Sequence, residues 1–313
     1  MNNLRLMKYS AVVCYYESMR STKTQNGQLP WRLSFEALGT QWRIDTKIQA
    51  TNHLIEAILR RVESFDKTYS RFRTDSLIHA ISTTAGQYTF PENVTKLITL
   101  YRTLYDVTSG KVTPLIGNTL EDAGYNASYS FTPTELGKVP AWDEVMTWDG
   151  RMVRTSTPIT IDFGAAGKGY LVDMISQILI KDRHLDFVID ASGDIYHRGT
   201  SKNVVGLEHP FKSDTVIGAL NIQNASLCAS AVNRRAWGDG LHHIFDPTTL
   251  TPVKNIIATW VVAESALIAD GIATALFFTE PEILQHHFAF DFVRMHQNNT
   301  IDYSSRFDGE LYI

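Results

Sequence analysis

Apolar residues recur at intervals of three and four positions in two segments, the spacing that draws one stripe along a helix. The first stripe covers residues 54–65 and predicts an amphipathic helix packed on a core. The second covers residues 94–107, and Gly110 behind it is expected to stop the helix. Further helices are predicted over residues 168–181 and 266–278.

Much of the remaining chain consists of short β-like runs. Residues 40–48 alternate between apolar and polar positions, which indicates a half-buried strand, whereas the apolar run 256–263 indicates a fully buried one. Further strands are predicted over residues 152–155, 159–163, 186–189, 195–198, 204–208, 216–222, 241–245 and 291–296. Since strands outnumber helices without strict alternation, we predict an α+β fold rather than a doubly wound parallel sheet.

Two stretches show little periodicity. Residues 1–30 are rich in Ser, Thr, Asn and Gln, and we expect an N-terminal extension or loosely packed arm there. Residues 111–150 contain Pro, Asn and Trp and are expected to form loops with short helices. The rest of the 313-residue chain, residues 31–313, is predicted to be a single domain, large enough to enclose a site.

Composition excludes several classes of protein. With 44% hydrophobic and 20% charged residues, the chain is neither disordered nor fibrous. Lys and Arg number 29 against 33 Asp and Glu, a net charge of 29 − 33 = −4, and no stretch is densely basic, so no nucleic-acid partner is expected. The two cysteines, Cys14 and Cys228, lie far apart and predict neither a disulfide framework nor a thiolate zinc site.

No membrane span is expected, because the most apolar region, residues 256–278, is interrupted by Glu264 and Asp270. The apolar stretch at residues 11–16 is too short for a secretory signal peptide. We therefore expect a cytoplasmic protein. The alternative is a protein that is exported or associated with the envelope through an unrecognised signal.

The densest group of special residues is DFGAAGKGY, residues 162–170, between a predicted strand and a predicted helix. Its three glycines let backbone approach a ligand, and the helix N-terminus together with Lys168 favours an anion such as a phosphate. The segment is not a Walker A loop, because Asp162 stands five positions before Gly167 and Gly169 follows the lysine. A turn with a purely structural role is the alternative.

Three smaller groups could also carry chemistry. Asp270 and Thr274 lie four positions apart on a predicted helix, so a carboxylate and a hydroxyl share one face and suit Mg²⁺, unless the carboxylate only meets the helix dipole. Adjacent His242 and His243 on a strand would point to opposite faces, so one could be a general base or both could be structural. Residues 190–194, DASGD, form an acidic turn that turn chemistry alone can explain.

In this order and spacing, the groups resemble the FAD:protein FMN transferase family, the ApbE-like flavin transferases, over residues 35–278. Residues 162–170 are similar to the family's Asp-Leu-Gly-Gly-Ile-Ala-Lys-Gly-Tyr motif. Other family motifs are matched, in chain order, at residues 38–40, 70–76, 190–194, 242–247 and 269–274. Each match alone is a weak signal. The resemblance rests on all of them occurring in the same order along the chain.

The resemblance implies an ApbE-like, T-fold-type architecture with mixed or antiparallel sheets, flanking helices and FAD bound in a central cleft. It also implies a reaction, the Mg²⁺-dependent transfer of FMN from FAD to a Thr or Ser hydroxyl of an acceptor flavoprotein, with release of AMP. FAD is then the substrate, Mg²⁺ the cofactor and the acceptor flavoprotein the partner.

The resemblance also implies roles for single residues. The metal ligands would be Asp270, Thr274 and the backbone carbonyl of Ala165. Contacts to FAD would come from Leu38, Phe72, Thr113, Asp162, Lys168 and Ile244. Phe72 would stack on the isoalloxazine, and His243 could take the proton from the incoming hydroxyl.

The chain departs from the family pattern in a flavin-contacting segment. The family's Gly-x-Phe-Asp-Pro-Thr reads GKVTPL at residues 110–115, with Thr113 in place of Asp and Leu115 in place of Thr. In the glycine motif, Ala165 replaces a Gly and Gly167 an Ala, which leaves a carbonyl ligand in place. Two alternatives to transfer stay open: an FAD-binding protein without transferase activity, and an FAD pyrophosphatase that gives FMN and AMP.

Overall fold

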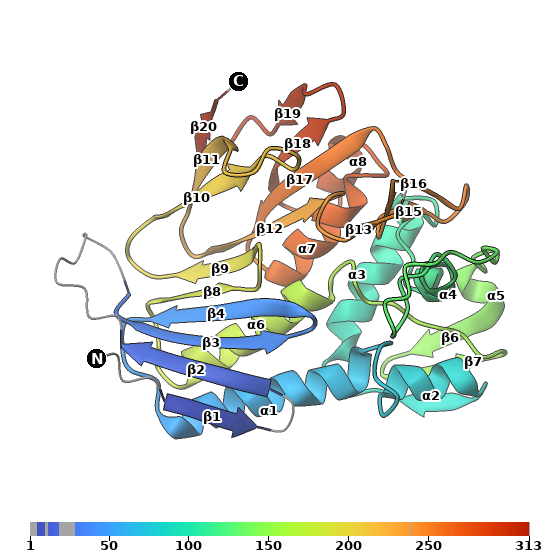
Figure 1. Cartoon of the computed structure of the whole chain (residues 1–313), viewed down its shortest axis with the longest axis horizontal. Coiled ribbons are helices and arrows are strands. Elements are labelled where there is room, and N and C mark those ends of the chain that lie inside the picture. The colour runs from blue at the N-terminus through green and yellow to red at the C-terminus, as the bar shows by residue number, and fades with distance from the viewer. Residues whose placement is uncertain (1–4, 10–11, 19–28, 239, 313) are drawn as a thin grey trace.

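The computed structural model describes residues 5–9, 12–18, 29–238 and 240–312 (Figure 1). Within these residues, the largest sheet has ten strands in the order β1-β2-β3-β4-β8-β9-β12-β17-β18-β19, and all neighbouring pairs are antiparallel. The strands are β1 (Arg5–Tyr9), β2 (Val12–Ser18), β3 (Trp31–Ala37), β4 (Thr40–Thr46), β8 (Phe187–Asp190), β9 (Asp194–Arg198), β12 (Ala225–Ala231), β17 (Ile256–Ala263), β18 (Asp291–His296) and β19 (Ile301–Tyr303). The chain leaves this sheet after β4, β9 and β12, and these excursions carry most of the other elements.

Helices α6 (Gly167–Lys181) and α7 (Ala266–Ala275) pack against the sheet, and α1 (Asn52–Tyr69) and α3 (Val94–Val107) pack against these two helices. Figure 1 shows this helical layer on one side of the sheet. The apolar stripe predicted over residues 54–65 is buried in the layer, which confirms the first helix. Thr51 caps the N-terminus of this helix, because its hydroxyl accepts the Leu54 N–H at 3.2 Å.

The opposite face of the sheet is partly covered by a second, smaller sheet. It consists of β10 (Asn203–Glu208), β11 (Val216–Ile222) and β20 (Gly309–Leu311). Leu207 and Ile217 of this sheet share a buried apolar cluster with Trp260 of β17, while Val261 of the same strand belongs to the cluster on the helical side. Because β17 is covered on both faces, its sequence is apolar almost throughout, as predicted.

The remaining elements are short. A three-stranded sheet and two hairpins are formed by β5 (Gln87–Thr89), β6 (Met146–Asp149), β7 (Met152–Thr155), β13 (Ala236–Trp237), β14 (Leu241–His242), β15 (Phe245–Asp246) and β16 (Thr251–Pro252). Short helices are α2 (Leu77–Thr83), η1 (Pro114–Ile116), α4 (Gly117–Asp122), α5 (Trp142–Val145) and α8 (Pro281–Gln285). Three of these helices lie within residues 111–150, where loops with short helices were predicted, but strand β6 also lies there and was not predicted.

Two predicted strands are wrong. Residues 159–163 form no strand, because the N–H groups of Thr160 and Asp162 donate to the side chain of Asn118 (2.9 Å) and to the carbonyl of Pro114 (2.7 Å). Residues 241–245 are not one strand but parts of the separate hairpins β13–β14 and β15–β16. The described strands that were not predicted include β3, β5, β6, β12, β19 and β20.

The N-terminal residues expected to form an extension contain β1 and β2, and β2 pairs with β3, so these strands lengthen the sheet. The other residues of the segment 1–28 lie outside the described part, as does the side chain of Cys14, and the division at residue 30 stays a prediction. Cys228 is a buried free thiol. In the described part of the chain, no helix is long and apolar enough to cross a bilayer.

Candidate active site

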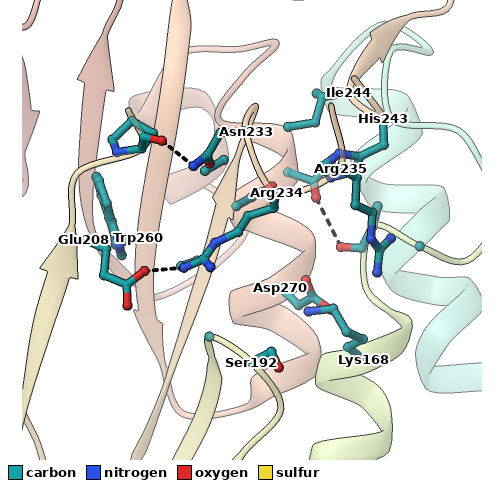
Figure 2. Close-up of a pocket in the computed structure, with 18 of the residues that line it drawn as sticks. Lys168, Ser192, Glu208, Asn233, Arg234, Arg235, His243, Ile244, Trp260 and Asp270 are labelled. Carbon is teal, nitrogen blue, oxygen red and sulfur yellow. Dashed lines mark hydrogen bonds and ion pairs between the residues drawn. The ribbon is translucent and has the colours of Figure 1, made fainter. Parts of the chain in front are cut away.

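A cavity of about 1010 Å³ lies among the described residues where the start of α6, helix α7 and the end of β12 meet (Figure 2). Its wall includes residues of the segments 111–116, 208–216, 229–235 and 243–245. The predicted site residues that line it are Thr113, Asp162, Ala165, Lys168, His243, Ile244, Asp270 and Thr274. Leu38 and Phe72 do not line it, although Gly39, the neighbour of Leu38, does.

The glycine turn before α6 is folded around the carboxylate of Asp162. One carboxylate oxygen accepts the N–H of Gly164 at 2.6 Å, and the other accepts Nε of Arg71 at 2.5 Å. The N–H of Ala165 donates to the hydroxyl of Tyr101 on α3 at 3.1 Å. These contacts fix the turn from three sides and leave the carbonyl of Ala165 facing Thr274, whose hydroxyl donates to it at 3.4 Å.

Asp270 and Thr274 both reach the cavity from α7, which confirms that they share one helix face. Helix α6 approaches α7 so closely that a Cβ on Gly169 would lie 2.1 Å from the carbonyl oxygen of Ala266. The same glycine donates its N–H to Asp270 Oδ2 at 2.9 Å. The glycine that the sequence places after Lys168 is therefore required for helix packing and for holding the carboxylate.

The environment of Asp270 raises the pKa of its carboxyl to about 8. Burial is the main cause, and the negative charge of Asp194 adds to it. Lys168, the N–H of Gly169 and Arg235 act in the opposite direction. In the protein without a bound cation, this carboxyl therefore retains a proton at neutral pH.

Lys168 forms an ion pair with Asp194, the first residue of β9. Burial by itself lowers the pKa of Lys168, but the carboxylates of Asp194 and Asp270 outweigh it, so the lysine stays charged. Asp194 is completely buried, and its Oδ1 has no hydrogen-bond partner among the described residues. The tight turn predicted at residues 190–194 is confirmed, with positive φ at two residues and Ala191 N–H donating to the carbonyl of Asp194.

The two adjacent histidines face in different directions, as predicted. His242 is buried, and its Nε2 lies 3.0 Å from the carbonyl of Val253. His243 lines the cavity, and its buried Nδ1 has no hydrogen-bond partner among the described residues. Burial, followed by the positive charge of Arg235, holds the pKa of His243 well below its usual range. The ring is therefore neutral.

Phe72, the residue expected to stack on the flavin ring, is enclosed by other side chains. The Arg71 guanidinium carbon lies 4.1 Å from its ring centroid, and Tyr129 stacks on it with 5.7 Å between centroids. Its role towards flavin, like that of Leu38, stays a prediction.

The outer rim of the cavity, which we call the lip, consists of residues 208–216 and their two partners. Asn233 donates to the carbonyl of Pro210, and Arg234 pairs with Glu208 at 2.5 Å. Both side chains of the ion pair are more than half exposed. The ion pair of the lip is thus a surface contact, while the N–H of His209 ties the lip's backbone by donating to the carbonyl of Thr215 at 2.8 Å. The ion pair contrasts with the contacts of the inner wall, the name we give to the cavity residues of segments 162–170 and 269–274.

The sequence reasoning assigned no role to Arg71, Asp194 or Arg235. Arg71 is buried and binds Asp162, which lies 91 positions away in the chain. Asp194 lies within the predicted turn 190–194, and Arg71 lies within the matched segment 70–76. The motifs therefore include both residues without giving either a role. Their partners could not be read from the sequence because no spacing rule connects residues so far apart.

The polar groups in the cavity fit an anionic ligand and a hard cation. The described residues contain no cluster of three or more His, Cys, Asp or Glu side chains that could hold a metal ion by themselves. A carboxylate, a hydroxyl and a backbone carbonyl are supplied by residues that line the same cavity, and oxygen donors of these kinds suit Mg²⁺ when water or phosphate completes its shell. A neutral histidine on the same wall can act as a base.

A family model with the description ApbE family matches residues 38–291. Relatives named FAD:protein FMN transferase include one from Haemophilus influenzae, 26% identical over 78% of this chain and 79% of its own length, and one from Vibrio cholerae, 23% identical over 78% and 80%. A relative of the same name from Rhodobacter capsulatus is 27% identical over 61% of this chain, which spans only 40% of that protein.

Solved structures show the same fold. An ApbE protein from Thermotoga maritima superposes with a TM-score of 0.75 at 24% identity, covering 88% of this chain and 96% of that one. The flavin transferase ApbE from Vibrio cholerae gives a TM-score of 0.73 at 17% identity with the same coverage. These superpositions confirm the predicted α+β, ApbE-like architecture.

Proposed function

Because this chain belongs to the ApbE family, we propose that it is an FAD:protein FMN transferase that binds FAD in the cavity described above. The FMN moiety passes to a Thr or Ser hydroxyl of an acceptor flavoprotein, Mg²⁺ is required, and AMP is released. One observation carries this proposal: the Ala165 carbonyl, Asp270, Thr274 and the neutral His243 line the same cavity. Its volume of about 1010 Å³ is large enough for a dinucleotide.

The residues present fit a magnesium ion. Asp270 offers one carboxylate oxygen while the other is held by Gly169, and the hydroxyl of Thr274 and the carbonyl of Ala165 already face each other. These three groups would hold the ion together with water and phosphate oxygens. When bound, Mg²⁺ supplies charge neutralisation for the phosphoryl oxygens and for the departing AMP.

The remaining groups serve binding and proton transfer. Lys168 places a positive charge at the start of α6, beside the place where the pyrophosphate would lie. The acceptor hydroxyl attacks the phosphorus of the FMN phosphate, the bond to the AMP phosphate breaks, and His243 takes the hydroxyl proton. Thr113, Asp162 and Ile244, which line the cavity, contact the rest of FAD.

The decisive experiment is intact-mass spectrometry of a flavoprotein acceptor after incubation with this protein, FAD and Mg²⁺. We expect the acceptor to gain the mass of one FMN, with AMP in solution and no gain in EDTA. Free FMN and AMP without labelled acceptor would instead indicate the pyrophosphatase. Unchanged FAD, while an active relative labels the same acceptor, would indicate an FAD-binding protein without transfer.

Two variants test the residue roles in that assay. Asp270→Asn removes the only charged group proposed as a metal ligand, so transfer should fall about 1,000-fold or more. His243→Ala should slow transfer while FAD affinity stays near the wild-type value. Normal transfer by Asp270→Asn would refute the metal assignment, and loss of FAD binding in His243→Ala would make His243 a binding residue rather than a base.

A further inference from the structure

Two consecutive arginines at the cavity have different surroundings. Arg234 is exposed and forms an ion pair with Glu208 on the lip. Arg235 is half-buried and lines the cavity, yet its guanidinium forms no ion pair with any carboxylate in residues 29–238 and 240–312. Figure 2 shows the two side chains diverging, with Arg234 reaching Glu208 and Arg235 extending on the side of His243.

The other cations on the cavity wall differ from Arg235. Lys111 pairs with Asp246 at 3.1 Å, and Lys168 pairs with Asp194. Lys212 has no ion-pair partner in the described part of the chain, but it is exposed on the lip. Arg235 is thus an unpaired, partly desolvated positive charge, an arrangement that costs free energy unless an anion compensates it.

The charge of Arg235 reaches the inner wall. It lowers the pKa of Asp270 after the larger effects of burial, Asp194 and Lys168, and it lowers that of His243 after burial. Arg235 lines the same cavity as Asp270 and His243, so a ligand that fills the cavity can contact all three residues. The Arg235 guanidinium carbon lies 5.9 Å from the centroid of the Tyr125 ring.

The backbone around Arg235 is well fixed. Its carbonyl accepts the N–H of His243 at 3.2 Å, and the next but one residue, Trp237, donates its Nε1–H to the carbonyl of Ala123 at 2.9 Å. Arg235 and His243 are therefore joined by one backbone hydrogen bond.

We propose that Arg235 binds the pyrophosphate of FAD through its guanidinium. This inference rests on the proposed function and adds a residue that the motif matches left without a role. The planar guanidinium can donate two parallel hydrogen bonds to phosphate oxygens, which a lysine cannot do. The charges also agree: Lys168 is already paired with Asp194, so of these two cations Arg235 is the one left to meet the negative charge of a pyrophosphate.

Binding of three flavins to the full-length protein tests this role. FAD carries two phosphates, FMN one and riboflavin none, and flavin fluorescence titration with Mg²⁺ present gives a Kd for each. Arg235→Gln should weaken FAD binding about 10- to 100-fold, the loss typical of a charge-assisted hydrogen bond. Riboflavin binding should stay unchanged. Arg235→Lys should recover part of the FAD affinity.

The matched control is Arg234→Gln, which removes the neighbouring charge and should leave all three Kd values within about twofold. Thermal unfolding checks that each variant is folded. Equal losses for FAD and riboflavin, or an unchanged Kd for FAD in Arg235→Gln, would overturn the assignment. The assay needs no acceptor: a wild type that binds FAD but transfers nothing refutes the proposed function alone, and one that binds no FAD refutes both.

Discussion

The inner wall and the lip of the cavity are built in opposite ways. At the inner wall, Asp270 is buried and held by an N–H donor from another helix, 101 positions away in the chain. At the lip, the Glu208–Arg234 pair leaves 68% and 58% of the two side chains exposed. The difference shows that the groups proposed to act on phosphate are fixed by core packing. The ion pair of the lip is a contact that water and salt can replace.

The inner wall depends on the close approach of α6 and α7, and Gly169→Ala should break it. A Cβ there would lie 2.1 Å from the carbonyl oxygen of Ala266 and 2.7 Å from Cβ of Asp270, and neither backbone nor Cβ can move aside cheaply. We expect a loss of about 3 kcal/mol in the free energy of unfolding, larger than the gain of about 1 kcal/mol that Ala normally brings to a helix. Denaturant unfolding measures it.

Gly167→Ala is the matched control in the first turn of the same helix. A Cβ at this position would meet Cβ of Phe163 at 3.7 Å and Cζ of Phe65 at 3.9 Å, which is ordinary contact. We expect unchanged stability or a gain of about 0.5 kcal/mol. If both variants lost the same stability, the close approach at Gly169 would not be what holds the inner wall together.

The second prediction concerns pH. Burial, with Asp194 next, raises the pKa of Asp270 to about 8, so the carboxyl is protonated below that pH and Mg²⁺ must displace the proton. Mg²⁺ affinity should therefore rise about tenfold per pH unit up to about pH 8 and then level off. Calorimetric titration of the protein with Mg²⁺ at several pH values measures this, and Asp270→Asn should abolish the dependence.

The same shift has a consequence for stability. A carboxyl whose pKa is raised in the folded state contributes stability that is fully present below its unfolded pKa of about 3.9 and is lost as pH rises through about 8. The metal-free protein should therefore become less stable as it approaches pH 8, and Mg²⁺ should restore stability there. An Mg²⁺ affinity independent of pH would contradict both expectations.

The two regions also differ in how far the sequence predicts them. The inner wall is encoded in two short segments, 162–170 and 269–274, whose glycines, carboxylate and hydroxyl have local reasons to be there. The sequence therefore indicated Asp270, Thr274 and Lys168, and the structure brings them to one cavity. The sequence did not predict that Lys168 pairs with Asp194. This contact joins α6 to β9, and it depends on the order of the strands in the sheet.

The lip was not predicted, for a different reason. Residues 204–208 and 216–222 were predicted as strands, and β10 and β11 confirm them. The loop between them has no periodicity, and its contacts with Asn233 and Arg234 depend on how the small sheet sits over the large one. Strand β12 was missed as well. Its residues are mostly small and give no clear apolar pattern, and they are buried because α7 and β17 pack against them.

The smallest expected effect comes from the lip. Glu208→Gln removes the charge from an exposed ion pair, so the free energy of unfolding should change by less than about 1 kcal/mol. A double-mutant cycle with Arg234→Gln isolates the coupling, which should be about 0.5 kcal/mol and should vanish near 1 M salt. Urea unfolding of the four proteins at two salt concentrations measures it. A coupling of several kcal/mol that persists at high salt would mean that the lip is as firmly built as the inner wall, and the contrast between the two regions would fail.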